Sequence, residues 1–341
     1  PPHPPSPPPA PPASIEPFKL EFIGCEHDEG LGALQCRYSS VSDAREESTT
    51  SQKPLLLLDF AGDSTTDEVF SHPLLAEAAD SLFIAVRLPA EEPLIGKGSV
   101  RVVSSDGTDT LGQVPESLLS VASVSMLMVK GLTLAQTTIP VYLQLLSEEQ
   151  NGRQQWQSNG RRIDRHALFG VSDSTEGEVE FGGLDGVLAT RCGHVGRQPV
   201  VQLTYDSTRL SFCSLVRFAV QQNLADVVYY QSSDEKIAAR MELQRVEATT
   251  SELVSFLGTT TIQPSVNAKI GLRQTMLRFV PMTDLQATRA NRLAQRGAFN
   301  EATRLLSPRQ GMILMRSMQT KGLIEAVDVP IKQAWKRLSE E

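Results

Sequence analysis

The sequence predicts an α/β fold that ends in a helical arm. Residues 54–60 (PLLLLDF) and 81–88 (SLFIAVRL) are continuous apolar runs, which are typical of strands buried on both faces of a sheet. A capping-box pattern, which marks a helix start, lies between them at Thr65 and Glu68. Towards the C-terminus, Thr283 and Pro330 mark helix starts.

Length and composition bound the fold and the function. The 341 residues suffice for two domains and an appendage, and 40% hydrophobic residues allow a sizeable core. A net charge of −8 and an aromatic content of 6% argue against a nucleic-acid binder. We expect no transmembrane segment, because no apolar run is long enough to cross a bilayer.

Proline dominates the N-terminus, where it supplies nine of the first twelve residues. Such a run predicts an extended, disordered spacer over residues 1–17. The spacer either follows an upstream anchor in the cell envelope or is a linker left by processing.

The first domain, expected over residues 18–150, follows the order strand, helix, strand, hairpin, helix, which is typical of an α/β fold. Thr65 and Glu68 fit a capping box that opens the first helix. Asp106-Gly107 is a strong hairpin-turn signal. The other expected elements are strands at 99–104 and 108–112 and helices at 115–130 and from Pro140 to about Glu149.

Residues 53–88 and 99–112 resemble a thioredoxin-fold protein. In that family the first strand leads to W-C-x-x-C, where a helix N-terminus stabilises a thiolate. This chain has AGDSTT at residues 61–66, and Ser99 falls where the family has a cis-proline. The resemblance therefore implies a thioredoxin-like domain that lacks CxxC and thioredoxin activity.

A second resemblance extends over about 50 residues. Residues 167–178 (ALFGVSDSTEGE) resemble the active-site segment of methionine sulfoxide reductase A, roughly A-T-F-A-x-G-C-F-W-x-x-E. Residues 181–191 (FGGLDGVLATR) and 200–215 (VVQLTYDSTRLSFCSL) resemble two later segments of that family, in the same order. The resemblance implies a ferredoxin-like α+β domain over residues 155–262, with the arm at 263–341.

The family's chemistry is carried over residue by residue. Its nucleophilic cysteine falls on Asp173, its two substrate-holding aromatic residues on Ser174 and Thr175, and its glutamate on Glu178. The other positions of this vestigial site are His194, Tyr205 and Asp206. Because a carboxylate cannot supply the two electrons that reduce a sulfoxide, the resemblance implies that the reaction is lost.

A cysteine elsewhere in the chain could replace the missing nucleophile. The chain contains Cys25, Cys36, Cys192 and Cys213, and no C-x-x-C motif. They form either two disulfides or four buried thiols. Cys213, at an expected strand-to-helix junction, is the more plausible reactive thiol, because a helix N-terminus lowers a thiol pKa.

Two further site types receive weaker support. Cys192, expected near a strand end, gives only a weak metal signal with His194 and His166, so we expect no metal and no cofactor. Glu178 and Asp173 form either an acid–base pair or two solvated carboxylates.

The arm carries a local excess of positive charge. Residues 267–310 hold eight basic and two acidic residues, a net +6, which leaves −14 for the rest of the chain. The basic residues are Lys269, Arg273, Arg278, Arg289, Arg292, Arg296, Arg304 and Arg309. Such asymmetry predicts that the arm docks on an acidic surface, of this chain or of a partner.

Capping signals divide the arm into helices. Thr283 is the expected N-cap of a helix to about Arg296, and Asn300 that of a short helix ending before Ser307-Pro308. Met312, Met315 and Met318 share one helix face, which predicts core filling. Ile331, Trp335 and Leu338 mark a last amphipathic helix, which packs within the chain or against a partner.

The order of the parts resembles a bacterial group of thioredoxin-like (seleno)proteins with a reductase-like second half. That group uses a Val-Pro-Gly-Sec or Val-Pro-Gly-Cys element, which this chain lacks. The resemblance implies a degenerate, exported relative in the periplasm, in the cell envelope or secreted. The leading hypothesis is a pseudoenzyme that binds a protein partner as a scaffold. The alternatives are an oxidoreductase that uses the four cysteines, and a hydrolase or lyase that uses Glu178 and Asp173.

Overall fold

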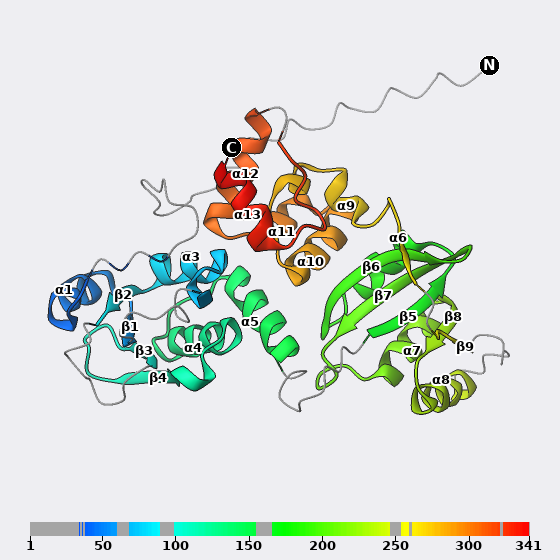
Figure 1. Ribbon diagram of the computed structural model, residues 1–341, viewed down its shortest axis with the longest axis horizontal. Coiled ribbons are helices and arrows are strands. Elements are labelled where there is room, and N and C mark those ends of the chain that lie inside the picture. The colour runs from blue at the N-terminus through cyan, green and yellow to red at the C-terminus, as the bar shows by residue number, and fades with distance from the viewer. Residues whose placement is uncertain are drawn as a thin grey trace, which may run out of the picture.

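The structure is a computed structural model that describes residues 34, 36, 38–59, 68–88, 99–154, 166–245, 254–258, 261–320 and 323–340. Within them the chain is a mixed α/β protein with a four-stranded and a six-stranded sheet. Figure 1 shows the first sheet on the left, the second on the right and the arm above and between them. None of the described helices has both the length and the apolar character that crossing a bilayer requires.

The first sheet has the strand order β2-β1-β3-β4, in which only the β1–β2 pair is parallel. Its strands are β1 (Leu55–Asp59), β2 (Ile84–Arg87), β3 (Ser99–Val103) and β4 (Thr110–Pro115). Leu56 and Leu58 pack into the core on one face, whereas Leu55 and Leu57 pack into a second cluster on the other. This confirms the prediction of a strand buried on both faces.

Helices cover this sheet. They are α1 (Val41–Ser51), α3 (Pro73–Leu82), the 3-10 turn η1 (Glu116–Leu118), α4 (Val121–Leu134) and α5 (Val141–Gln154). The predicted hairpin turn is confirmed, because Gly107 has φ +75° and the Asp106 carboxylate accepts a hydrogen bond from the Thr108 backbone N–H.

The second sheet has the strand order β10-β6-β7-β5-β8-β9, and only the β8–β9 pair is parallel. Its strands are β5 (His166–Val171), β6 (Val187–Val195), β7 (Gln198–Tyr205), β8 (Ala225–Tyr230), β9 (Val254–Phe256) and β10 (Gln263–Pro264). Its helices are α6 (Ser174–Phe181), α7 (Phe212–Gln221) and α8 (Ser233–Arg245). Phe181 of α6 and Leu215 of α7 share one core cluster with Phe169 and Cys192 of the sheet.

The arm consists of short helices. They are α9 (Ile270–Arg273), the 3-10 turn η3 (Met276–Phe279), α10 (Asp284–Gln295), α11 (Phe299–Thr303), α12 (Pro308–Gln319) and α13 (Ile331–Glu340). The predicted N-cap Thr283 is confirmed, since it forms a capping box with Gln286.

Three buried glutamates hold the arm by its helix N-termini. Glu77 of α3 accepts a hydrogen bond from the Arg309 backbone N–H at 2.7 Å. Glu149 of α5 accepts one from Leu285 at 2.8 Å, and Glu178 of α6 accepts one from Lys269 at 2.8 Å. Carboxylates are favourable there because a helix N-terminus presents unpaired N–H groups and positive potential. The arm therefore docks on the chain's own body, one of the two alternatives that its charge left open.

Two predicted boundaries in the first domain are wrong. The strand expected over residues 81–88 begins at Ile84, because α3 continues to Leu82. The helix expected over residues 115–130 begins later, because β4 continues through Pro115 and a capping box at Ser120 starts α4.

Three other local predictions need correction. The helix expected to end near Glu149 continues to Gln154. Ala298 is the N-cap of α11, and Asn300 already lies in its first turn. Cys192 lies inside β6 and pairs with Val201, rather than at a strand end.

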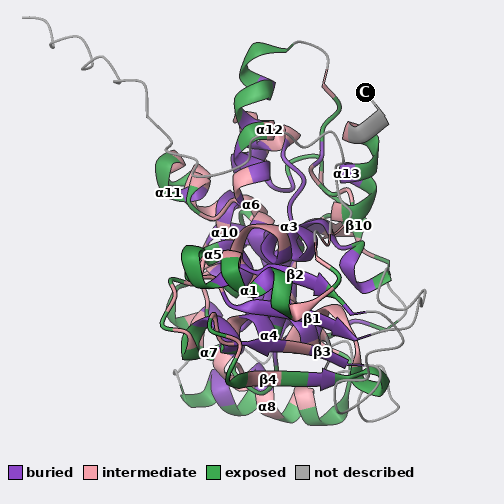
Figure 2. Cartoon of the chain, turned by 90° about the vertical axis from the view of Figure 1, so that its left-hand side faces the viewer, coloured by how far each residue is buried: buried purple, intermediate pink, exposed green. Residues whose placement is uncertain are grey.

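The prediction that the methionines fill the core is also wrong. Met312, Met315 and Met318 are 41%, 41% and 51% exposed, because α12 turns Gln310 and Leu314 inward instead. Figure 2 shows this helix with much of its surface exposed. The last helix behaves differently, since Trp335 of α13 is buried in the core of the first domain.

Some predictions fall outside the described residues. These are the spacer at 1–17, the segment 61–66 that replaces CxxC, and Cys25. Of the capping-box pair, Thr65 also lies outside them, whereas Glu68 is helical.

Candidate functional site

Asp173, where the sequence resemblance places a nucleophile, caps the helix that follows β5. One of its carboxylate oxygens accepts hydrogen bonds from the backbone N–H groups of Thr175 at 2.7 Å and Glu176 at 3.4 Å. Aspartate is a preferred N-cap because it satisfies N–H groups that have no partner within the helix. The exposed Asp173 therefore contributes to the start of its own helix.

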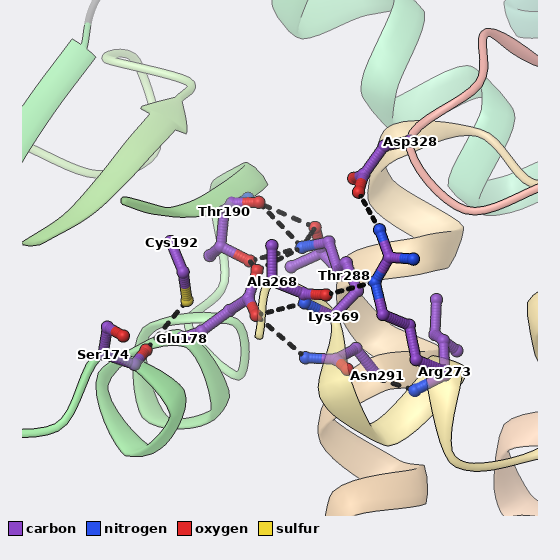
Figure 3. Close-up of polar contacts among 11 residues, drawn as sticks. Ser174, Glu178, Thr190, Cys192, Ala268, Lys269, Arg273, Thr288, Asn291 and Asp328 are labelled. Atoms are coloured by element: carbon purple, nitrogen blue, oxygen red, sulfur yellow. Dashed lines mark hydrogen bonds and ion pairs between the residues drawn. The ribbon is translucent and has the colours of Figure 1, made fainter. Parts of the chain in front are cut away.

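Glu178, where the sequence resemblance places a glutamate, is fully buried and faces the arm (Figure 3). Its Oε1 accepts hydrogen bonds from Lys269 Nζ at 2.9 Å and Thr190 Oγ1 at 3.2 Å. Its Oε2 accepts them from the Lys269 backbone N–H at 2.8 Å and Asn291 Nδ2 at 3.4 Å. Because a carboxylate has about four lone-pair sites, Glu178 has no acceptor site left for a substrate.

The Lys269 ammonium is as completely satisfied as its partner. Besides Glu178, it donates to the carbonyl oxygen and the hydroxyl of Thr190, both at 2.7 Å, and Thr288 Oγ1 lies 3.4 Å away. An ammonium has three N–H donors, so none is left unpaired. Such complete pairing is what a buried ion pair needs to offset the loss of hydration.

The backbone of Lys269 is also shaped by this contact. Lys269 precedes α9 with φ +54°, a left-handed conformation that costs roughly 1–2 kcal/mol for a residue with a side chain. Both its backbone N–H and its ammonium donate to Glu178. Two bonds to one carboxylate therefore hold the strained residue in place.

A sulfur atom lies beside the first turn of α6. The Cys192 thiol, buried in β6, donates a hydrogen bond to the Ser174 carbonyl at 3.0 Å. Burial, reinforced by the negative charge of Glu178, raises the pKa of this thiol far above its usual value. Since the thiolate is the nucleophile in sulfur chemistry, Cys192 is held in its unreactive form at neutral pH.

The structure does not bring Asp173 and Glu178 together as an acid–base pair. Asp173 is exposed and bonded to its own helix, whereas Glu178 is buried against the arm. Thr175 and Ser174 contribute backbone groups to these contacts rather than an apolar pocket.

The other residues that the resemblance singles out have structural roles. Tyr205 is buried in the core at the end of β7. The Asp206 carboxylate accepts hydrogen bonds from the backbone N–H and the hydroxyl of Thr208, at 2.9 and 2.7 Å. His194 is half-buried near the end of β6, where it pairs with Pro199 of β7 on one side and with Gln263 of β10 on the other.

The other candidate groups are dispersed. His166 shares a hydrogen bond with Thr204 rather than joining Cys192 and His194. Within the described ranges, no group of three or more His, Cys, Asp or Glu side chains is placed to hold a metal ion. Cys213 lies in the first turn of α7, at the helix start that the sequence predicts. It is a free, half-buried thiol, which was one of the two alternatives left open.

The sequence analysis missed the role of Lys269, which it counted only as one basic residue of the arm. Lys269 and Glu178 are 91 positions apart, so no local pattern connects them. No protein-family model matches this chain, and a search of curated proteins finds no match.

Proposed function

We propose that this chain is a non-catalytic interaction protein, built from a thioredoxin-like and a methionine sulfoxide reductase A-like domain that have lost their reactions. The saturated carboxylate of Glu178 carries the proposal. In the family that the second half resembles, this glutamate engages the sulfoxide oxygen. Here the arm supplies three of its four hydrogen-bond donors.

The architecture supports both parts of the proposal. From β1 to α4 the described elements follow the order strand, helix, strand, hairpin, helix on which the first resemblance rests. In the second domain, α6 follows β5 directly and places Asp173 at the helix N-terminus. The helix dipole would stabilise a thiolate at this position. An aspartate cannot replace a thiolate as an electron donor.

A chain that has lost both reactions can still bind a protein partner. Its basic arm already recognises buried carboxylates of its own body, while the methionines of α12 are left exposed. Flexible, polarisable methionines are common on surfaces that bind proteins. A partner protein is therefore part of the proposed function.

The reductase assay tests the catalytic half of the proposal. The full chain is incubated with a methionine sulfoxide peptide and dithiothreitol, and an active methionine sulfoxide reductase serves as the positive control. We expect no turnover above a protein-free blank. Turnover above the blank that disappears in Cys192→Ser or Cys213→Ser would overturn the proposal in favour of an oxidoreductase with a relocated thiol.

A further inference from the structure

A group of arginines lies between α10 and the loop that joins α6 to β6. Arg289 is half-buried and donates to the carbonyl oxygens of Gly182 at 2.6 Å and Leu184 at 2.9 Å. Burial lowers the pKa of Arg289. The carboxylates of Glu148 and Asp185 oppose this effect, and the positive charges of Arg292 and Arg209 add to it. The guanidinium groups are therefore close enough to repel one another.

The guanidinium group of Arg292 packs directly against Gly183 of this loop. An ideal Cβ on Gly183 would lie 2.5 Å from both Cζ and Nε of Arg292, so the guanidinium occupies the space that a side chain would fill. Arg292 Nε is buried and has no hydrogen-bond partner. Within the described part of the chain, Arg292 donates no hydrogen bond and forms no ion pair, in contrast to Arg289 one turn earlier on α10.

The neighbouring carboxylates already have partners. Arg209 lies 2.7 Å from Glu148 and 2.5 Å from Asp185, and Arg296 lies 2.5 Å from Glu180. The only acceptors of Arg289 among the described residues are neutral carbonyl oxygens. The carboxylates of Glu148 and Asp185 also act on the charge of Arg289, whereas Arg292 forms no ion pair with any described residue.

We propose that Arg292, seated on Gly183 and flanked by Arg289, is a binding site for an oxyanion, the group shared by phosphate and carboxylate. A guanidinium presents two parallel N–H donors that match two oxygens of such a group. The site lies just beyond the C-terminal end of α6, whereas Asp173 caps the N-terminal end, and it does not depend on the loss of catalysis. Reductase activity would leave this proposal standing.

Isothermal titration calorimetry on the full chain, at constant ionic strength, tests the site with two probes: inorganic phosphate and an acetylated hexapeptide of glutamate. We expect saturable binding of at least one probe. Arg292→Gln should weaken it by about tenfold or more, as expected for charge-assisted hydrogen bonds. Arg304→Gln removes an exposed arginine of the same arm and should change the affinity by less than about twofold.

Two variants separate geometry from charge. Gly183→Ala displaces the guanidinium without removing it and should weaken binding, and Arg292→Lys keeps the charge but loses the paired donors. Tighter binding of phosphate identifies a free oxyanion as the ligand, and tighter binding of the peptide identifies an acidic segment. Absence of saturable binding, or equal affinities of the wild type and a folded Arg292→Gln variant, would overturn the proposal.

Discussion

Glu77 in the first domain and Glu178 in the second perform the same task with different partners. Both are buried, and both accept a backbone N–H at the start of an arm helix. The described hydrogen bonds of Glu77 come from neutral groups, the Arg309 N–H and the Ser307 hydroxyl at 2.6 Å. Glu178 receives an ammonium as well.

The difference shows how each domain compensates a buried carboxylate. At Glu77, burial raises the pKa, and two neutral hydrogen bonds together with the positive charge of Arg309 only partly oppose this effect. At Glu178, one lysine side chain supplies the counter-charge, and all four acceptor sites are used. We therefore expect the arm to depend more strongly on a single side chain in the second domain.

The largest expected effect follows removal of that lysine. Lys269→Met leaves Glu178 buried without its counter-charge, and removing one partner of a buried ion pair costs about 3–5 kcal/mol. Urea-induced unfolding of the full chain measures this loss in the free energy of unfolding.

The double variant Glu178→Gln/Lys269→Met is the control. It removes both charges, so its loss should be smaller than that of Lys269→Met alone. A single variant that costs less than about 1 kcal/mol, the range of ordinary substitutions, would show that the ion pair does not hold the arm.

A second effect is confined to the first domain and depends on pH. His72, at the N-cap of α3, is buried, which lowers its pKa from 6.5 to about 4, with a smaller contribution from Lys332 of α13. The folded state thus holds a neutral imidazole. Its contribution to stability is complete above pH 6.5 and is lost as the pH falls towards 4, by about 3 kcal/mol in total.

The comparison of the wild type with His72→Gln isolates this titration, because Glu77 and Glu149 have raised pKa values and titrate with the opposite sign. Urea unfolding at several pH values should show the stability difference between the two proteins shrinking in acid. A difference that stays constant with pH would show that His72 is not held neutral.

The smallest effect is expected at Glu77. Glu77→Gln keeps one acceptor oxygen for the α12 N-terminus and loses the other, so it should cost about 1–2 kcal/mol. The same urea titration measures it beside Lys269→Met. If Glu77→Gln costs as much as Lys269→Met, the proposed contrast between the two domains is wrong.

Local signals predicted the elements that local physics determines. The run before Phe60 is a strand because each of its faces packs into an apolar cluster. Asp106-Gly107 forms its turn and Thr283 forms its cap, because these groups bond within a few residues. These features were readable without the rest of the chain.

The errors share a different cause. Apolar spacing shows that Met312, Met315 and Met318 share a helix face but not which face meets the body, and here they are exposed. The contact of Lys269 with Glu178 joins distant segments, so only the folded chain reveals it. The sequence named Glu178 as a candidate, but not the lysine that covers it.

Alkylation of Cys192 tests the proposed loss of thiol chemistry most directly, because this thiol lies beside the first turn of α6. The folded chain is treated with iodoacetamide at mildly alkaline pH, and peptide mass spectrometry compares Cys192 with half-buried Cys213 and with a urea-unfolded sample. The account predicts that Cys192 stays unmodified until the chain unfolds, because burial keeps it protonated and covered. Modification of Cys192 in the folded chain at least as fast as that of Cys213 would contradict a closed, unreactive site.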